Sequence, residues 1–463
     1  MTMTQNSQTL SERLATFVQG VRYAELPDYA VAKAKTCILD WVGVAMAASR
    51  DDVTQPLRAY VNAVGGTPDA TLLGVGTRTS VTNAALYNGT VGHLLDFDDT
   101  NQIFIGHASA VIVPAIFALA EMTHATGKDI IAAYMVGSEV QWKLGEALVN
   151  AGDHYALGWH STGTVGAFGA AAAAAWLLKL DHRQTTMALG LVASEAGGFQ
   201  EQFGTHAKPF HAGRSNEVGV RAALLAKAGL TSARTALDGK VGYFGLISNR
   251  YSVEKIGNFG KPWGILESTF ARGINLKAHP VCASGVGGIE GMQELIAEHG
   301  FSPADVESIR CGVRPGSLNI LAHHQPQTGL QAKFSVEYWM AATLVYGKLG
   351  LEQITDEAVQ NPAVQALIKK VQVDPDESID VSKARVNISV QLKDGRSLQK
   401  TYYPAKGAAD NPMNLEELTR KFGECLAWGG IGKAQILQAQ NILLSLEREE
   451  SIHGLMKHLV LAA

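Results

Sequence analysis

The sequence lacks the motifs on which most nucleotide-dependent and metal-dependent enzymes rely. It contains no GxGxxG after a predicted strand, no GxxxxGK[ST], no GxSxG and no HExxH. These absences remove support for dinucleotide binding, P-loop nucleotide binding, serine hydrolysis and zinc proteolysis. We expect no cofactor, so the side chains themselves must supply acid, base and anion stabilisation.

Cysteine is also scarce, and the four cysteines are far apart in the chain with no CxxC pair. This pattern argues against a Cys-rich zinc site and is typical of a reducing cytoplasm. The first residues lack the basic region and apolar core of a secretory signal. The most apolar stretch, residues 163–178, is too short to span a bilayer and predicts a tightly packed core helix. We therefore expect a cytoplasmic protein.

The chain also has few charged residues and a small net charge. Charged residues make up 18% of the chain and hydrophobic residues 46%, with a formal net charge of −4. This balance indicates a folded globular protein and gives no general attraction to nucleic acid or anionic membranes. Any anion-binding role must come from a few placed cations, and 463 residues are enough for two or three domains.

The periodicity of apolar residues changes along the chain. Helical spacing dominates the first 250 residues, whereas Val386, Ile388, Val390 and Leu392 alternate up to Asp394-Gly395, which is a hairpin signal. We predict a mainly α fold with a large all-helical domain, interrupted by a smaller α+β lid domain and completed by the C-terminus. The expected boundaries are 1–270 for the first helical part, 271–405 for the lid and 406–463 for the last helical part.

An acidic run follows His93. Asp96, Asp98 and Asp99 lie within four residues, and His107 comes shortly after them. A helix here would place His93 and Asp96 on one face. Three interpretations stay open: an acidic helix end in water, a magnesium site, and a carboxylate that orients a catalytic histidine. No second acidic cluster at a matching place supports the magnesium site.

Three further segments carry candidate anion-binding groups. His160 directly precedes a predicted helix, where free N–H groups favour anions, although a hydrogen-bonded loop histidine is the simpler interpretation. Lys208 precedes Pro209, which predicts an extended loop lysine that could clamp a carboxylate or lie on the surface. Lys277 and His279 lie where the α+β unit is expected to begin, and active sites often form at domain interfaces.

Five segments, in this order along the chain, resemble the MmgE/PrpD family. They are LLDFDDT with the following His107, GWHSTGTVGAFGAAAAAAW, THAKPFHAGRSNEVGV, LDGKVGYFG and LKAHPVCASG. The resemblance spans about residues 10 to 460 and implies a helical domain completed by the C-terminus, a lid domain and a homodimer. It also implies a pocket lined by Asp96, Thr100, His107, His160, Lys208 and Lys277.

The family's known reactions are 2-methylcitrate dehydration, cis-aconitate decarboxylation and iminodisuccinate epimerisation, all without a cofactor. The resemblance therefore implies proton transfer at a carbon next to a carboxylate of a small polycarboxylic acid. We assign His107 and His160 as base and acid, Asp96 as the residue that orients one of them, and Lys208 and Lys277 as carboxylate partners. Thr100 and His279 complete the expected substrate contacts, and no metal is expected.

The lid segment departs from the family pattern. Decarboxylase-like members carry a pocket tyrosine there, whereas residues 318–324 contain none and offer His323 and His324 instead. Residues 328–335 also differ from the methylcitrate dehydratase branch. These departures favour epimerisation of iminodisuccinate, with a lyase of the same family as the alternative. A magnesium-dependent isoprenoid-type lyase using Asp96, Asp98 and Asp99 and a non-enzymatic polycarboxylate-binding protein are also compatible with the residues.

Overall fold

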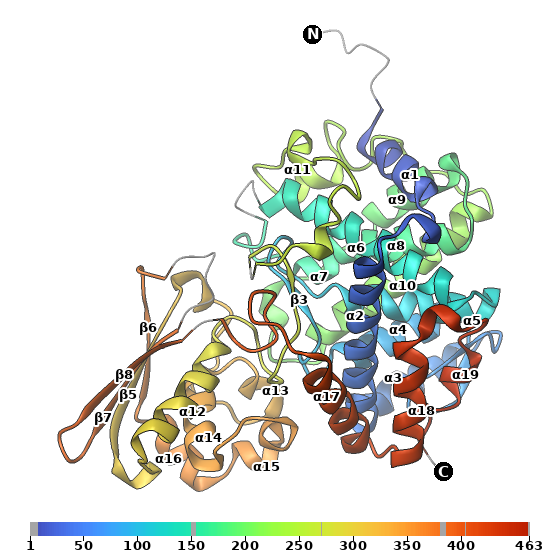
Figure 1. The fold of residues 1–463 in the computed structure, drawn as a ribbon. Helices are drawn as coiled ribbons and strands as arrows, with labels where there is room; N and C mark the ends of the chain where they lie inside the picture. Colours follow the sequence, from blue (N-terminus) through green and yellow to red (C-terminus); the bar gives the residue numbers. More distant parts are fainter. Residues whose placement is uncertain (1–7, 150–153, 270, 380–385, 403, 462–463) are drawn as a thin grey trace.

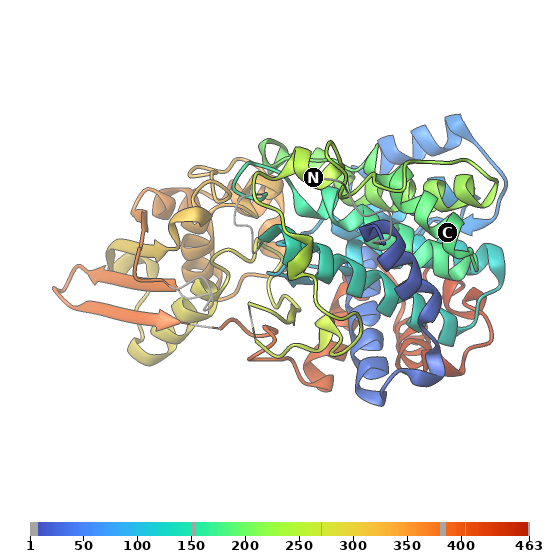
Figure 2. The ribbon, with the colours of Figure 1, turned by 90° about the horizontal axis from the view of Figure 1, so that it is seen from above.

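The computed structural model describes residues 8–149, 154–269, 271–379, 386–402 and 404–461. The chain is mainly helical, as predicted, and most of its helices gather in one large part. A smaller part with the longest strands lies beside it, on the left in Figure 1, and the view from above in Figure 2 shows the same side-by-side arrangement.

The large part contains the first eleven α-helices. These are α1 (Leu10–Gly20), α2 (Asp28–Ala47), α3 (Thr54–Val64), α4 (Val81–His93), α5 (Val113–Thr123), α6 (Gly127–Val149), α7 (Ser161–Thr164), α8 (Gly166–Leu177), α9 (His182–Ala193), α10 (Ala207–Lys227) and α11 (Tyr243–Ile247). Two short two-stranded sheets accompany them: β1 (Ala70–Thr71) with β2 (Arg78–Thr79), and β3 (Thr100–Asn101) with β4 (Ile274–Asn275). Capping residues begin several helices, such as Thr9 at α1 and Asp181 at α9.

The Ala-rich helix α8 lies in the core of this part. All of its residues except Trp176 are buried, which confirms the predicted core helix. Small side chains allow neighbouring helices to approach closely, and Gly219 of α10 lies directly against Ala170 of α8. Among the described helices, none combines the length and the apolar composition that crossing a lipid bilayer requires.

Helices α4 and α10 pack closely near the candidate site. A Cβ atom on Gly89 of α4 would lie 2.9 Å from the Cα of Gly213 on α10, and a Cβ on Gly213 would collide with the carbonyl oxygen of Leu86. Only glycine permits this separation of the two backbones. The contact places the C-terminal end of α4, at His93, beside the N-terminal turn of α10, at Lys208.

The smaller part is a four-stranded sheet with helices on one face. Strand order is β6-β5-β7-β8, with β5 parallel to β6 and antiparallel to β7. Its elements are α12 (Gly287–His299), β5 (Val306–Val313), α13 (Gly329–Ala332), α14 (Val336–Tyr346), α15 (Asp356–Val359), α16 (Pro362–Ile368), β6 (Val371–Pro375), β7 (Val386–Leu392) and β8 (Ser397–Tyr402). The predicted hairpin at Asp394-Gly395 joins β7 to β8, and Gly395 has a φ of 92°.

The last helices return to the large part. They are α17 (Leu415–Trp428), α18 (Lys433–Leu444) and α19 (His453–Met456). Phe422 of α17 packs on Gly43 of α2, and the buried ammonium of Lys421 lies 2.7 Å from Asp40 of α2. These contacts attach the C-terminal helices to the large part (Figure 1).

Candidate active site

The segment after α4 determines where the acidic side chains point. Helix α4 ends at His93, and Asp96 has a φ of 50°, so the prediction that His93 and Asp96 share a helix face is wrong. Aspartate tolerates this left-handed conformation better than most residues. The turn lets Asp96 and Asp98 face different partners, and the chain then continues into β3.

Asp96 joins the two predicted lysines. Its Oδ2 atom lies 3.1 Å from Lys208 Nζ, and its Oδ1 atom and its backbone oxygen accept hydrogen bonds from Lys277 Nζ. All three residues are buried. Burial alone would raise the pKa of Asp96, but the Lys208 and Lys277 ammonium groups hold it well below its usual range. The carboxylate is therefore ionised and neutralised by the two cations.

Lys277 reaches this position through a strand pair. Strand β4 ends two residues before Lys277 and pairs antiparallel with β3, so that Thr100 lies opposite Asn275. This pairing fixes the start of the Lys277 segment beside the acidic run. His279, which was predicted to contact the substrate together with Lys277, does not lie beside Asp96. Its Nδ1 lies 2.8 Å from the Leu349 carbonyl oxygen.

Lys208 lies in the first turn of α10, so the predicted extended loop at this residue is wrong. Pro209 is the third residue of that helix, where the missing N–H would have no intrahelical partner and costs little. The Lys208 ammonium lies 2.9 Å from His93 Nε2 and 5.4 Å from the centroid of the Phe334 ring. An imidazole lone pair and an aromatic face therefore help to hold this cation in the interior.

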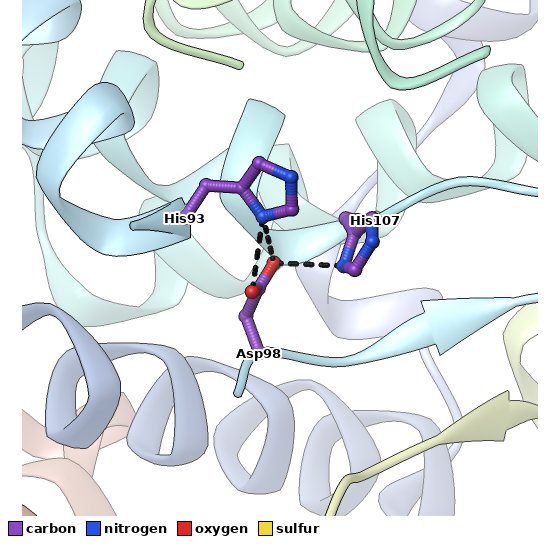
Figure 3. A group of neighbouring side chains, drawn as sticks. All are labelled: His93, Asp98 and His107. Carbon is purple, nitrogen blue, oxygen red and sulfur yellow. Dashed lines mark hydrogen bonds and ion pairs between the residues drawn. The ribbon is translucent and has the colours of Figure 1, made fainter. Parts of the chain in front are cut away.

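Asp98 lies between two histidines (Figure 3). Each of its oxygens is 3.0 Å from His93 Nδ1, and Oδ2 is also 3.0 Å from His107 Nδ1. Burial lowers the pKa of His93 to about 3, although Asp98 opposes the shift. Burial also lowers the pKa of His107, again against the effect of Asp98. Both rings are neutral at pH 7, with the Asp98 carboxylate ready to stabilise a proton on either.

His160 precedes α7, as the sequence predicted, and its backbone N–H donates to the carbonyl oxygen of Gly198. Its Nδ1 atom lies 2.9 Å from His211 Nδ1 on α10. Burial lowers the pKa of His160 well below its usual value, and the Lys208 ammonium acts in the same direction. His160 is therefore a neutral imidazole whose polar partner is a second imidazole.

These groups surround one cavity of about 40 Å³. Its walls come from both parts of the chain and are formed by Asp96, Thr100, Gln102, Ile105, Gly106, His107, Tyr155, His160, Phe203, Lys208, Cys282, Ala283, Ser284 and Phe334. Five of the six pocket residues implied by the family resemblance line it directly. The sixth, Lys277, lies behind Asp96.

The remaining histidines singled out in the sequence lie elsewhere. His279 faces Leu349 and Glu290, so the structure does not bring it to the cavity. His323 Nε2 lies 3.3 Å from the Phe203 carbonyl oxygen, and His324 is paired with Glu337 on the surface of the smaller part. Neither histidine from the 318–324 segment lines the cavity.

Comparison with known protein families identifies two domain models that match this chain. The model of the MmgE/PrpD N-terminal domain matches residues 12–255, and that of the MmgE/PrpD C-terminal domain matches residues 279–444. The chain belongs to the MmgE/PrpD family. This membership confirms the resemblance that the ordered motifs indicated.

Several proteins similar in sequence to this MmgE/PrpD chain are named cis-aconitate decarboxylase. The chain is 28% identical to human cis-aconitate decarboxylase over 436 residues, which cover 91% of this chain and 89% of the relative. It is 27% identical to the mouse enzyme of the same name, with 90% and 86% covered. It is 26% identical to cis-aconitate decarboxylase of Aspergillus terreus, with 94% and 92% covered.

Four residues of this MmgE/PrpD chain belong to the site, although the sequence analysis did not assign them to it. His93 and Asp98 lie in the acidic run that was recognised, but their roles depend on a turn that periodicity did not reveal. His211 follows Lys208 by three residues, which a helical interpretation of that segment would have placed on the same face. Tyr155 lines the cavity from a segment without any sequence signal.

Asp99 faces away from the lysines and histidines. Its carboxyl accepts a hydrogen bond from the Ser109 N–H at 3.1 Å and contacts the Ser109 hydroxyl, which lies 2.8 Å from the Tyr134 hydroxyl. Burial raises the pKa of Asp99 to about 7, although the Ser109 bonds oppose the shift. The acidic run therefore divides into three carboxyl groups with three separate sets of partners.

Asp99 should make the stability of the fold depend on pH. A raised folded-state pKa contributes stability that is present below the unfolded value of about 4 and is lost as the pH rises through about 7. We expect the free energy of unfolding of the wild type, relative to Asp99→Asn, to fall across that range. Denaturant titrations of both proteins at several pH values measure it, and a difference independent of pH would contradict this assignment.

A metal ion was not expected, yet one group of ligand atoms converges among the residues that the structure describes. Atoms of His93, Asp98 and His107 lie within 4.8 Å of one another and could hold an ion. The nearby cations disfavour it, because Lys208 Nζ lies 2.9 Å from His93 Nε2 and would repel a divalent ion. The predicted magnesium alternative required Asp96, Asp98 and Asp99 together. Their separate partners show that these three carboxylates do not converge on one ion.

Proposed function

We propose that this chain is a cofactor-independent lyase that removes a carboxyl group from a small unsaturated tricarboxylic acid of the cis-aconitate type. The observation that supports it best is the meeting of His107, His160 and Lys208 around one buried cavity. Imidazoles can transfer protons and an ammonium group can bind a carboxylate, and the human and mouse relatives carry the name cis-aconitate decarboxylase.

Substrate binding is assigned to cations and donors that face the cavity. The Lys208 ammonium lines it and would pair with a substrate carboxylate, while Lys277 acts through Asp96. The Thr100 hydroxyl is buried and has no hydrogen-bond partner in the described part of the chain. A buried hydroxyl without a partner is costly, so a substrate oxygen there would gain a hydrogen bond that the free protein lacks.

Proton transfer is assigned to His107. Its Nδ1 lies 3.0 Å from Asp98 and its Nε2 lies 3.6 Å from Asp96, so two carboxylates stabilise its protonated form. When the carbon–carbon bond to the leaving carboxylate breaks, carbon dioxide departs and the electron pair enters the neighbouring unsaturated carboxylate. His107, which is neutral in the free protein at pH 7, first takes a proton from solvent. The imidazolium then gives its Nε2 proton to carbon, and the neutral ring is restored.

Entry of the substrate requires the cavity to widen. A volume of about 40 Å³ has room for one or two waters but not for a tricarboxylate. Phe334 and the segment from Cys282 to Ser284 form one wall, whereas His107, His160 and Lys208 come from the helical part. We propose that the α+β part acts as the predicted lid and moves away from the helical part to admit the acid.

Epimerisation of an iminodisuccinate-like diacid is the second candidate. It is favoured by two imidazoles from separate segments lining the same cavity, since removal and return of a proton on opposite faces needs two groups. The argument against decarboxylation was a missing lid tyrosine. Tyr155 lines the cavity from the helical part, so the absence of a lid tyrosine no longer argues against decarboxylation.

Proton NMR in deuterated water separates the candidates. With cis-aconitate, we expect release of carbon dioxide and a product that carries one solvent deuteron on carbon. Deuterium uptake by iminodisuccinate without loss of carbon would identify the epimerase instead. If cis-aconitate, iminodisuccinate, methylcitrate and citrate all remain unchanged, the proposed function is wrong and a binding role is favoured.

Removal of metal ions gives a further prediction. We expect full activity after prolonged incubation with excess EDTA, because the proposed steps use only imidazole, carboxylate and ammonium groups. The measurement is the rate of substrate loss before and after dialysis against the chelator. Loss of activity that added Mg²⁺ or Zn²⁺ restores would assign the group of His93, Asp98 and His107 to a metal.

A further inference from the structure

The two histidines that line the cavity differ in the group behind them. His107 Nδ1 lies 3.0 Å from the Asp98 carboxylate, whereas His160 Nδ1 lies 2.9 Å from the imidazole of His211. In the described part of the chain, the histidines within ion-pair distance of a carboxylate are His93, His107, His279, His299 and His324. His160 and His211 are not among them, so none of the described carboxylates lies at that distance to stabilise a proton on this pair.

A contact between two Nδ1 atoms requires one donor and one acceptor, because a neutral imidazole carries a single N–H. His160 also lines the cavity, where the substrate carboxylates are proposed to bind. An Nε2–H facing those carboxylates donates a hydrogen bond, whereas an Nε2 lone pair would repel them. The proton of His160 therefore belongs on Nε2, and its Nδ1 must accept.

From this geometry we infer that His211 is a positioning residue that donates its Nδ1–H to His160 and thereby holds His160 as a neutral Nε2–H donor facing the cavity. His160 then stabilises negative charge on the substrate, and His107 alone carries the proton. The inference rests on the proposed function, because the position of the His160 proton is argued from carboxylates bound in the cavity, but the tautomers can be measured without turnover.

The surroundings of His211 fit this role. His211 is 9% exposed and His160 is 2% exposed, so the outer ring of the pair has more access to solvent, which can donate to the lone pair left on His211 Nε2. Gly198 contacts both residues: its carbonyl oxygen accepts from the His160 backbone N–H, and a Cβ there would lie 2.9 Å from the His211 ring. Burial lowers the pKa of His211 to about 4, which keeps this ring neutral as well.

Nitrogen-15 NMR of histidine-labelled protein tests the tautomers without any turnover. The signals of the two rings are assigned by their loss in His160→Gln and His211→Gln. We expect the wild type to show His160 protonated on Nε2 and His211 protonated on Nδ1. A wild-type spectrum with the His160 proton on Nδ1 would overturn the inference, whichever acid the enzyme uses.

Kinetics of two His211 variants test the catalytic role. His211→Phe keeps a ring but removes the donor, and we expect kcat to fall about tenfold to a hundredfold with little change in KM. His211→Asn carries an amide N–H that can replace the Nδ1–H, and it should recover part of that loss. The surface variant His299→Asn is the matched control. Equal kcat values for wild type and His211→Phe would remove His211 from the reaction, even if the tautomers are as expected.

Discussion

Replacing His107 with glutamine is expected to lower kcat by about 10²–10⁴-fold, the range typical for loss of a placed proton-transfer group. The fold should survive, because His107 is neutral at pH 7 and glutamine retains a polar side chain of similar length. His107 is the ring whose two nitrogens lie near Asp98 and Asp96, at 3.0 and 3.6 Å. A neutral amide there can neither take nor give the proton.

Steady-state kinetics on the accepted acid provide the measurement, with His299→Gln as a control. His299 is an exposed histidine at the end of α12 and lies outside the cavity lining. Asp98→Asn should lower kcat as well, but by a smaller factor, because the ring remains while its carboxylate support is lost. An unchanged kcat in His107→Gln would mean that another group transfers the proton.

Replacing Asp96 with asparagine is expected to lower the free energy of unfolding by about 3–5 kcal/mol, the range for breaking a buried ion pair on one side. Asp96 is the common counter-ion of two buried ammonium groups, Lys208 and Lys277. The amide would leave both cations without this negative partner in the interior. Activity should fall too, because the position of Lys208 depends on this carboxylate.

Denaturant unfolding of the wild type and Asp96→Asn at pH 7 measures the difference. Glu121→Gln is the matched control, since Glu121 is a buried carboxylate that accepts from the Thr71 N–H and Arg78 and lies outside the cavity lining. That variant should lose stability while its kcat is retained. An Asp96→Asn protein as stable as the wild type would show that the lysines do not need this counter-ion.

The pH dependence of the Asp96 effect has a definite sign. The folded-state pKa of Asp96 is held well below its usual range, so its contribution to stability is present above the unfolded value of about 4 and is lost as the pH falls. The stability difference between wild type and Asp96→Asn should therefore shrink in acid. Asp99 acts in the opposite direction, because burial raises its pKa to about 7.

The sequence motifs predict the class of chemistry but do not decide between isomerase and lyase activity. The family motifs predicted the polycarboxylate chemistry, but the choice of epimerisation depended on a tyrosine missing from residues 318–324. The cavity contains Tyr155, which comes from a different segment. The relatives found by comparison are named as decarboxylases, which supports the lyase and gives no specific support to epimerisation.

The sequence by itself determined the mainly α class, the core position of α8, the hairpin at Asp394-Gly395 and the place of His160 before a helix. Each follows from local spacing or local capping, which short segments encode directly.

Only the tertiary structure decided that Asp96 meets Lys208 and Lys277, which are 112 and 181 residues away. That meeting depends on the close glycine contact of α4 with α10 and on the pairing of β3 with β4, which bring distant backbones together. The helical conformation of Lys208, the left-handed turn at Asp96 and the partnership of His160 with His211 were decided in the same way, because packing selects among conformations that the local sequence leaves open.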